Sequence, residues 1–62
     1  MKFQVGDILI NIKGEFCNLT VISIDETRLF YMVRDIHGSE FPAGLRSEQC
    51  YRKATKLELA LL

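Results

Sequence analysis

Apolar and polar residues alternate in several short segments of this chain, and a period of two predicts β-strands rather than helices. In the segment 8–13, Ile8, Ile10 and Ile12 share one face. The segment 18–24 is again rich in β-branched residues, but its apolar residues change from one face to the other along it. This change of phase indicates either a β-bulge or a strand that is covered on both faces.

The segment 29–35 gives the strongest strand prediction, because large apolar side chains occur on both of its faces. The two faces are Leu29, Tyr31 and Val33 on one side, and Phe30, Met32 and Arg34 on the other. If the first face fills the core, the second face points outward.

Turn-forming residues separate these strands and predict reversals of the chain. They lie in the segments 14–15, 25–28 and 36–39. Gly38, in the last of these segments, is free to adopt a positive φ. The residues 40–41 precede Pro42 and predict no more than a short edge strand.

The last third of the chain predicts less regular structure. We expect 43–48 to be irregular or to form one short turn, and 49–53 to form a last short strand. Thr55 and Glu58 have the spacing of a capping box, which predicts a helix over 56–62. A helix this short is unstable alone in water, so we expect it to dock on the sheet through its leucines. These are Leu57, Leu59, Leu61 and Leu62.

Short strands at a spacing of about ten residues, with turns between them, are typical of a small all-β domain. The 62 residues leave room for one domain with one core. An open sheet of this size leaves an edge and one face in water, and the strands are too apolar for that. We therefore predict a small barrel of four to five antiparallel strands with a short C-terminal helix, spanning residues 1–62.

Several motifs resemble those of small SH3-like β-barrel proteins. They are Val5-Gly6-Asp7 at the opening of the first strand, Ile24-Asp25 at the end of the second, and Tyr31-x-Val33 in the third. The tail Tyr51-Arg52-Lys53-Ala54-Thr55-x-x-Glu58 is similar to the end of short SH3-like proteins that bacteriophages and prophages encode. The resemblance covers most of the chain. It implies an SH3-like barrel that binds proteins, peptides, nucleic acids or small ligands through its loops and edges.

Two features of true SH3 domains are missing from the chain, which limits what the resemblance implies about ligands. The chain has no Trp, and no long acidic loop follows its first strand. The proline-peptide specificity of SH3 domains is therefore not carried over to this protein.

The charge balance excludes binding that depends on bulk charge. Eight Lys and Arg residues match eight Asp and Glu residues, so the formal net charge is +0. Residues 1–40 hold four basic and six acidic residues, and residues 41–62 hold four basic and two acidic residues. A neutral domain lacks the long-range field of a nucleic-acid coat, although the second half still allows a local cationic patch.

The chain carries no signal for a membrane. No stretch of 18 apolar residues is present, so we expect no membrane-spanning helix. The first seven residues lack the apolar core and the cleavage site of a signal peptide. We therefore expect a cytoplasmic protein of bacterial or viral origin.

The residue types that most often carry catalysis or bind metals are few and scattered. Cys17 and Cys50 lie 33 positions apart and His37 is the only histidine, which does not give the spacing of a zinc finger. We expect the two thiols to be reduced and partly buried, with a disulfide between them as the alternative. No catalytic motif is present, so we expect no enzyme, no cofactor and no metal site.

An aromatic residue, a methionine and an arginine on one exposed strand face have the composition of an interface centre. We therefore predict a protein-binding surface centred on Phe30, Met32 and Arg34, with Arg28 and His37 at its rim. The partner is a host protein, as the phage resemblance implies, or a second copy of this chain. A small domain with more apolar strand surface than its core can hide favours a homo-oligomer.

Two open points affect this predicted surface. Neighbouring strands extend it if Leu9, or one of Thr20 and Ile22, points to the same side. The alternative is that the C-terminal helix covers Phe30 and Met32 and leaves no free surface there.

A second hypothesis is a small nucleic-acid or nucleotide-binding protein. Tyr51 lies beside Arg52 and Lys53, and Lys56 follows three positions later. An aromatic ring stacks on a base, and cations beside it hold a phosphate. Two or three cations suffice for a discrete nucleotide, so such a ligand does not require a positively charged domain.

Overall fold

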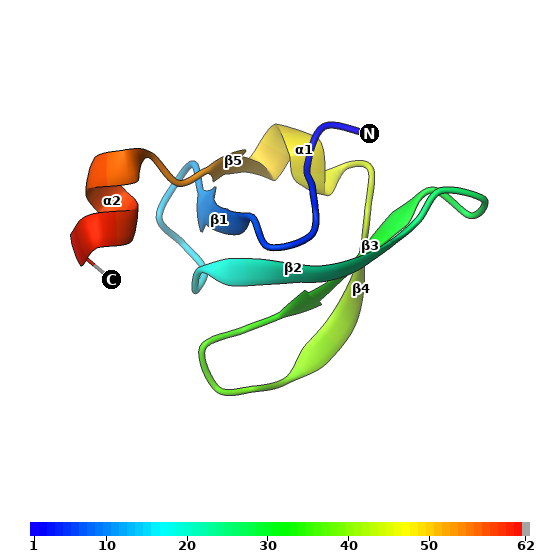
Figure 1. The fold of residues 1–62 in the computed structure, drawn as a ribbon, viewed down its shortest axis with the longest axis horizontal. Helices are drawn as coiled ribbons and strands as arrows, with labels where there is room; N and C mark the ends of the chain where they lie inside the picture. Colours follow the sequence, from blue (N-terminus) through cyan, green and yellow to red (C-terminus); the bar gives the residue numbers. More distant parts are fainter. Residues whose placement is uncertain (62) are drawn as a thin grey trace.

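The computed structural model describes residues 1–61, which form one antiparallel five-stranded sheet and two short helices (Figure 1). In chain order the elements are β1 (Ile8–Asn11), β2 (Leu19–Asp25), β3 (Phe30–Arg34), β4 (Glu40–Gly44), α1 (Ser47–Cys50), β5 (Tyr51–Lys53) and α2 (Lys56–Leu61). The prediction of a small, mostly-β fold with a short C-terminal helix is confirmed.

The strand order in the sheet is β4-β3-β2-β1-β5, so β4 and β5 are its two edge strands. No hydrogen-bonded pairing joins these two edges within residues 1–61, and the sheet is therefore not closed. Figure 1 shows the β3–β4 hairpin on one side of β2, with β1 and β5 on the other. The predicted closure of the sheet into a barrel is therefore not confirmed: the sheet curls around its core while its two edge strands stay unpaired.

A β-bulge in β2 explains why the apolar residues of this strand change face. The pairing of β2 with β3 shifts register between Val21 and Ser23. An extra residue on one strand turns the side chains that follow it. Val21 is therefore buried in the core, and Ile24 also packs against it from beyond the bulge.

The core consists of six buried apolar side chains from the N-terminal segment and the three central strands. They are Phe3, Leu9, Leu19, Val21, Tyr31 and Val33. The ring centroids of Phe3 and Tyr31 lie 5.3 Å apart, which is within the range where aromatic rings stabilise each other. Because Phe3 precedes the first strand, the N-terminal segment itself covers part of the core.

In β1 the residues that face the core are Leu9 and Asn11, and not the isoleucines. Leu9 is fully buried, whereas Ile12 just after the strand is 58% exposed. β1 lies between β2 and β5 in the sheet. Its face with Leu9 and Asn11 meets the core, and its other face points away from the core. The expectation that Leu9 extends an outward-facing patch is therefore wrong.

Two segments in the second half differ from their predictions. β4 is longer than expected, because it continues through Pro42 to Gly44. Pro42 lies opposite Met32 in an edge strand, where the missing N–H of proline is tolerated. The helix α1 includes Gln49 and Cys50, so the last strand begins only at Tyr51.

Both hairpin turns contain a residue with a left-handed backbone. Gly38, between β3 and β4, adopts φ of 86°, as predicted. Leu29, between β2 and β3, adopts φ of 59°, which a residue with a Cβ rarely does. Leu29 is also 51% exposed, so the prediction that it shares the buried face of the strand is wrong.

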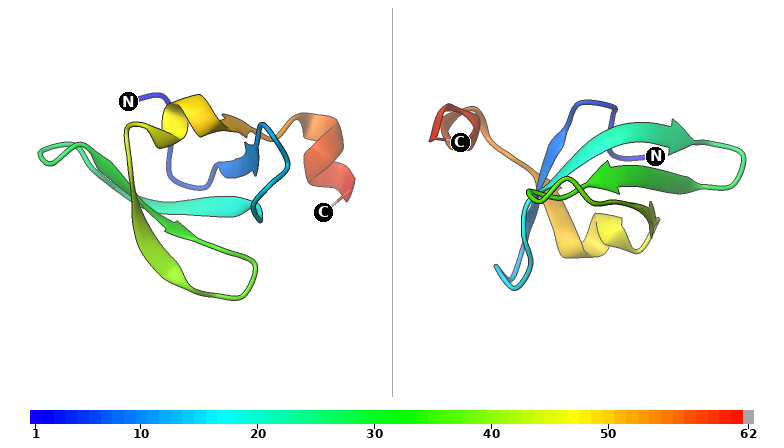
Figure 2. Two further views of the ribbon diagram at one scale, coloured as in Figure 1. Left: turned by 180° about the vertical axis from the view of Figure 1, so that it is seen from behind. Right: turned by 90° about the horizontal axis from the view of Figure 1, so that it is seen from below.

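The helix α2 begins at the predicted capping box, but the predicted docking of this helix is wrong. The Glu58 amide donates to Thr55 Oγ1 at 3.2 Å, and the Thr55 amide donates to Glu58 Oε1 at 2.9 Å. The leucines Leu57, Leu59 and Leu61 are 71%, 46% and 79% exposed. Figure 2 shows α2 standing apart from the sheet, beyond the end of β5.

A contact at the first turn of α2 explains its position. Arg52 in β5 donates two hydrogen bonds to the Glu58 carboxylate, at 2.6 and 2.8 Å, which holds the helix beside the end of β5. α2 contains no buried residue, so it does not form a cover over Phe30 and Met32. Leu62, the last leucine of the predicted docking face, lies outside the described residues.

Candidate functional site

An apolar groove of about 580 Å³ runs between the loop after β1, the edge strand β4, the helix α1 and the start of β5. Its apolar and thiol-bearing walls come from Ile12, Phe16, Cys17, Phe41, Cys50 and Tyr51. Concave apolar surfaces of this size are the usual sites of ligand and partner binding. This groove is the best candidate for a functional site in the described part of the chain.

The groove lies where the two edge strands of the sheet approach each other without pairing. Phe41 in β4 is directly opposite the buried Val33 in β3, so it projects from the core side of the sheet. Tyr51 packs against the core from β5, the other edge strand. The core-facing side chains of both edges therefore meet at an open seam, which explains why the groove is apolar.

A tight turn after β1 builds one wall of the groove. Asn11 is buried, and its Oδ1 accepts hydrogen bonds from the amides of Lys13 at 3.0 Å and Glu15 at 3.2 Å. Gly14 has φ of 70° and donates its amide to the Asn11 carbonyl. The turn is thus held by its own first residue, and it presents Phe16, which is 66% exposed.

Backbone contacts of α1 hold the opposite wall. The Ile12 amide donates to the Cys50 carbonyl at 2.9 Å, which ties the end of α1 to the end of β1. The Ser47 hydroxyl donates to the Gly44 carbonyl at 2.6 Å, which ties the start of α1 to β4. Both walls are therefore anchored to the sheet, and the groove is preformed.

The charged residues around the groove balance each other. Lys13 and Arg46 contribute two cations, and Glu15 and Asp35 contribute two carboxylates. A balanced rim does not attract a strongly charged ligand. The groove is suited to an apolar segment with a few polar contacts at its edges.

Both cysteines of the chain line the groove. They are free and exposed, so the expectation that they are partly buried is wrong, and no disulfide joins them in this structure. Residues 1–61 contain no cluster of three or more His, Cys, Asp or Glu side chains placed to hold a metal ion. No helix in the same part of the chain is long and apolar enough to cross a membrane.

The predicted partner-binding residues of β3 lie on one face, but away from the groove. Phe30 and Met32 are half-buried on the face opposite Tyr31 and Val33. Arg34 is exposed and forms an ion pair with Glu40 at 2.7 Å. None of the three predicted residues lines the groove.

The two predicted rim residues lie at opposite ends of β3. Arg28 precedes the strand and its guanidinium lies 4.0 Å from the carboxylate of Asp25. His37 follows the strand, in a turn where its amide donates to Asp35 Oδ1 at 2.9 Å. Both are exposed, but the structure does not bring them together at one rim.

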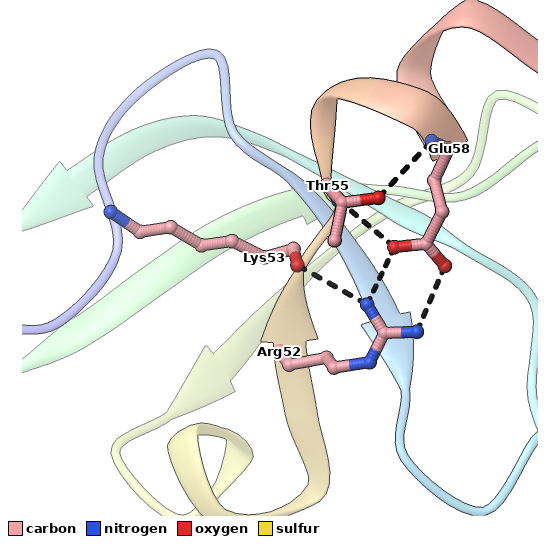
Figure 3. Close-up of polar contacts among 4 residues, drawn as sticks. All are labelled: Arg52, Lys53, Thr55 and Glu58. Atoms are coloured by element: carbon pink, nitrogen blue, oxygen red, sulfur yellow. Dashed lines mark hydrogen bonds and ion pairs between the residues drawn. The ribbon is translucent and has the colours of Figure 1, made fainter.

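The four residues of the nucleic-acid hypothesis do not form one cationic cluster. Figure 3 shows Arg52 held by Glu58, with the Lys53 side chain pointing away from this pair. Lys53 Nζ lies 3.5 Å from the Asp7 carboxylate, Tyr51 lines the groove, and Lys56 is exposed on α2. The Arg52 guanidinium lowers the pKa of Glu58 to about 2, so this carboxylate stays charged and paired at neutral pH.

Sequence reasoning missed three apolar residues of the groove, Ile12, Phe16 and Phe41. The sequence does indicate that Phe16 is exposed. This large aromatic residue follows a glycine turn and lies outside the predicted strands, so no strand face buries it. Phe41 carries a weaker signal, because it precedes Pro42 in a predicted edge strand. Their meeting across the seam follows only from the curl of the sheet.

Comparisons with protein-family models, with curated proteins and with solved structures give no match for this chain.

Proposed function

We propose that this chain is a non-enzymatic protein-binding module and that its binding face is the apolar groove. The supporting observation is that exposed aromatic and aliphatic side chains, Phe16 and Ile12 above all, surround a preformed hollow with a balanced rim. Aromatic anchors at the centre of a polar rim characterise protein interfaces.

The fold supports a more specific proposal about origin. A curled antiparallel sheet in which the first four strands follow one another along the chain and the last strand pairs with the first fits a small SH3-like barrel whose seam is left open. Together with the motifs at Val5-Gly6-Asp7 and in the tail, this favours a cytoplasmic phage or prophage product that binds and modulates a host protein. The competing proposal of a nucleic-acid or nucleotide binder has less support, because Arg52 and Lys53 are both engaged in ion pairs.

The test compares single variants of the chain as baits in affinity capture from a bacterial lysate, with quantitative mass spectrometry. Phe16→Ser changes the groove, Phe30→Ser changes the outer face of β3, and Val5→Ser is a matched control. Val5 is 62% exposed, close to the 66% of Phe16, and does not line the groove. Thermal melting of each variant checks that it is folded.

We expect the native chain, Val5→Ser and Phe30→Ser to capture the same proteins, and Phe16→Ser to lose them. If Phe30→Ser loses the partners and Phe16→Ser keeps them, the binding face is the outer side of β3 and the proposal for the groove is wrong. Amide chemical-shift changes with a nucleotide or oligonucleotide at low salt, centred on Arg52 and Lys53, support the competing proposal instead.

A further inference from the structure

Within residues 1–61, the groove and the helix α2 are two apolar features that no other part of the structure covers. The groove belongs to the function proposed above, and the inference drawn here depends on that proposal. α2 is independent of it, because none of the residues that line the groove lies in α2.

The helix α2 is held firmly at its start and yet buries nothing. Six residues at 1.5 Å each give a length of about 9 Å, which is too short for a helix to be stable by itself. The capping box and the double hydrogen bond from Arg52 to Glu58 fix its first turn (Figure 3). Leu57 and Leu61, four positions apart, share one side of the helix and are 71% and 79% exposed.

The total surface of the chain indicates how much area is left without a partner. The chain exposes 4564 Å², whereas a compact monomer of 7.1 kDa exposes about 4,100 Å². The excess is about 500 Å², close to the roughly 600 Å² that each partner contributes to the smallest specific protein interfaces. This excess is consistent with a helix that stands apart from the sheet and buries no residue, and an interface that covers it has the size of a modest contact between two copies.

We infer that two copies of this chain associate so that α2 of each copy lies in the apolar groove of the other. The leucines of α2 match the apolar walls around Phe16 and Phe41. Lys56 is the cation of α2 that makes no ion pair within residues 1–61. Of the four charged residues on the balanced rim, the carboxylates of Glu15 and Asp35 are the ones that can pair with it.

The geometry favours exchange between copies over docking within one copy. Tyr51 lines the groove at the start of β5, while α2 begins beyond the other end of that strand. Figure 2 shows α2 apart from the sheet in both views. A reciprocal exchange uses the same two surfaces on each copy, so it closes as a two-fold dimer.

The first experiment measures molecular mass by sedimentation equilibrium over a range of concentrations. We expect the native chain and the control Val5→Ser to reach twice the 7.1 kDa monomer mass. The double variant Leu57→Gln, Leu61→Gln keeps good helix formers in α2, and we expect it to be monomeric. Phe16→Ser is expected to be monomeric as well, and the amide spectra of all variants check that the sheet is retained.

Mixing the two monomeric variants gives the most specific result. The α2 variant has an intact groove and the Phe16→Ser variant has an intact α2, so a mixed pair retains one of the two contacts. We expect the mixture to form a heterodimer, more weakly than the native dimer, although neither variant dimerises alone. If Phe16→Ser dimerises as tightly as the native chain, α2 packs elsewhere, for example on the second α2, and the inference is wrong.

The two cysteines give a readout that needs no substitution. Cys17 and Cys50 both line the groove, so docking of α2 covers them. We expect their reaction with a dithiobis-nitrobenzoate reagent to slow as the concentration of the native chain rises, and to stay constant for the α2 variant. If the native chain is monomeric at every concentration, the inferred dimer is wrong. If that monomer still captures other proteins in a way that depends on Phe16, the proposed function is retained without the dimer.

Discussion

The hydroxyl of Tyr31, in the centre of the core, donates a hydrogen bond to the carboxylate of Glu48 at the surface. Tyr31 is fully buried, and its oxygen also accepts a hydrogen bond from the Phe3 amide at 3.1 Å. The same carboxylate oxygen of Glu48 accepts the Lys2 amide at 2.8 Å. One hydroxyl and one carboxylate thus join the N-terminal segment, the sheet and α1.

The substitution Tyr31→Phe tests this connection. It removes the hydroxyl without changing the ring, and leaves the Phe3 amide without its acceptor. We expect the free energy of unfolding to fall by about 1–3 kcal/mol, as measured by urea denaturation. The control is Tyr51→Phe, because the Tyr51 hydroxyl makes no side-chain hydrogen bond within the described part of the chain; its expected effect is below about 0.5 kcal/mol.

The same contact predicts how the N-terminal segment responds to acid. The hydrogen bonds from Tyr31 and from the Lys2 amide lower the pKa of Glu48 below its ordinary value of 4.5. Ionised Glu48 therefore stabilises the fold fully above about pH 4.5, and this contribution is lost as the pH falls through the lowered pKa. The protection of the Lys2 and Phe3 amides, measured as their exchange rate relative to the intrinsic rate at each pH, should fall in that range, whereas Glu48→Gln should show the lower protection already at neutral pH. Unchanged exchange in Glu48→Gln contradicts the prediction.

The capping box of α2 predicts a local effect. Thr55→Ala removes the oxygen that accepts the Glu58 amide, a change that typically costs about 1 kcal/mol of helix stability. The Leu59 amide donates to the Thr55 carbonyl, so its hydrogen exchange reports whether the first turn is formed. We expect faster exchange at Leu59 with little change in the sheet, because α2 does not pack on it. Thr27→Ala, in an exposed turn, is the control.

The positive φ of Leu29 predicts which of two substitutions the turn tolerates better. A left-handed conformation costs a residue with a Cβ roughly 1–2 kcal/mol, and glycine avoids this cost. Leu29→Gly and Leu29→Ala remove the same apolar contacts, but Leu29→Ala keeps the strained backbone. We therefore expect Leu29→Gly to be the more stable of the two by about 1 kcal/mol in thermal or urea unfolding. Equal stability of the two variants shows that the turn relaxes to a negative φ.

The orientation of β1 predicts opposite outcomes for Leu9 in the strand and Ile12 just after it. Leu9 is fully buried, and Leu9→Ala should cost about 2–5 kcal/mol, enough to unfold much of a small domain. Ile12 is 58% exposed, so Ile12→Ala should change the free energy of unfolding by less than about 1 kcal/mol. A larger loss from Ile12→Ala than from Leu9→Ala contradicts the orientation of this strand.

Several elements could be predicted from the sequence because they depend on interactions between residues that are close together in the chain. The capping box at Thr55 and Glu58 and the turn at Gly38 each depend on residues only a few positions apart. The phase change in 18–24 follows from the bulge next to Val21, and the outward face of β3 follows from simple alternation. These features hold because each is decided by neighbouring side chains and backbone groups.

Other features depend on residues that are distant in the sequence. Alternation showed two faces for β1 but not which one is buried, and that depends on the strands beside it. Phe16 and Phe41, 25 positions apart, line one groove only because the curled sheet leaves its edges unpaired. The sequence by itself determined the first three strands, the turn at Gly38 and the helix cap, whereas the tertiary structure decided the extent of β4, the open seam and the exposure of the α2 leucines, since these depend on how separate segments pack.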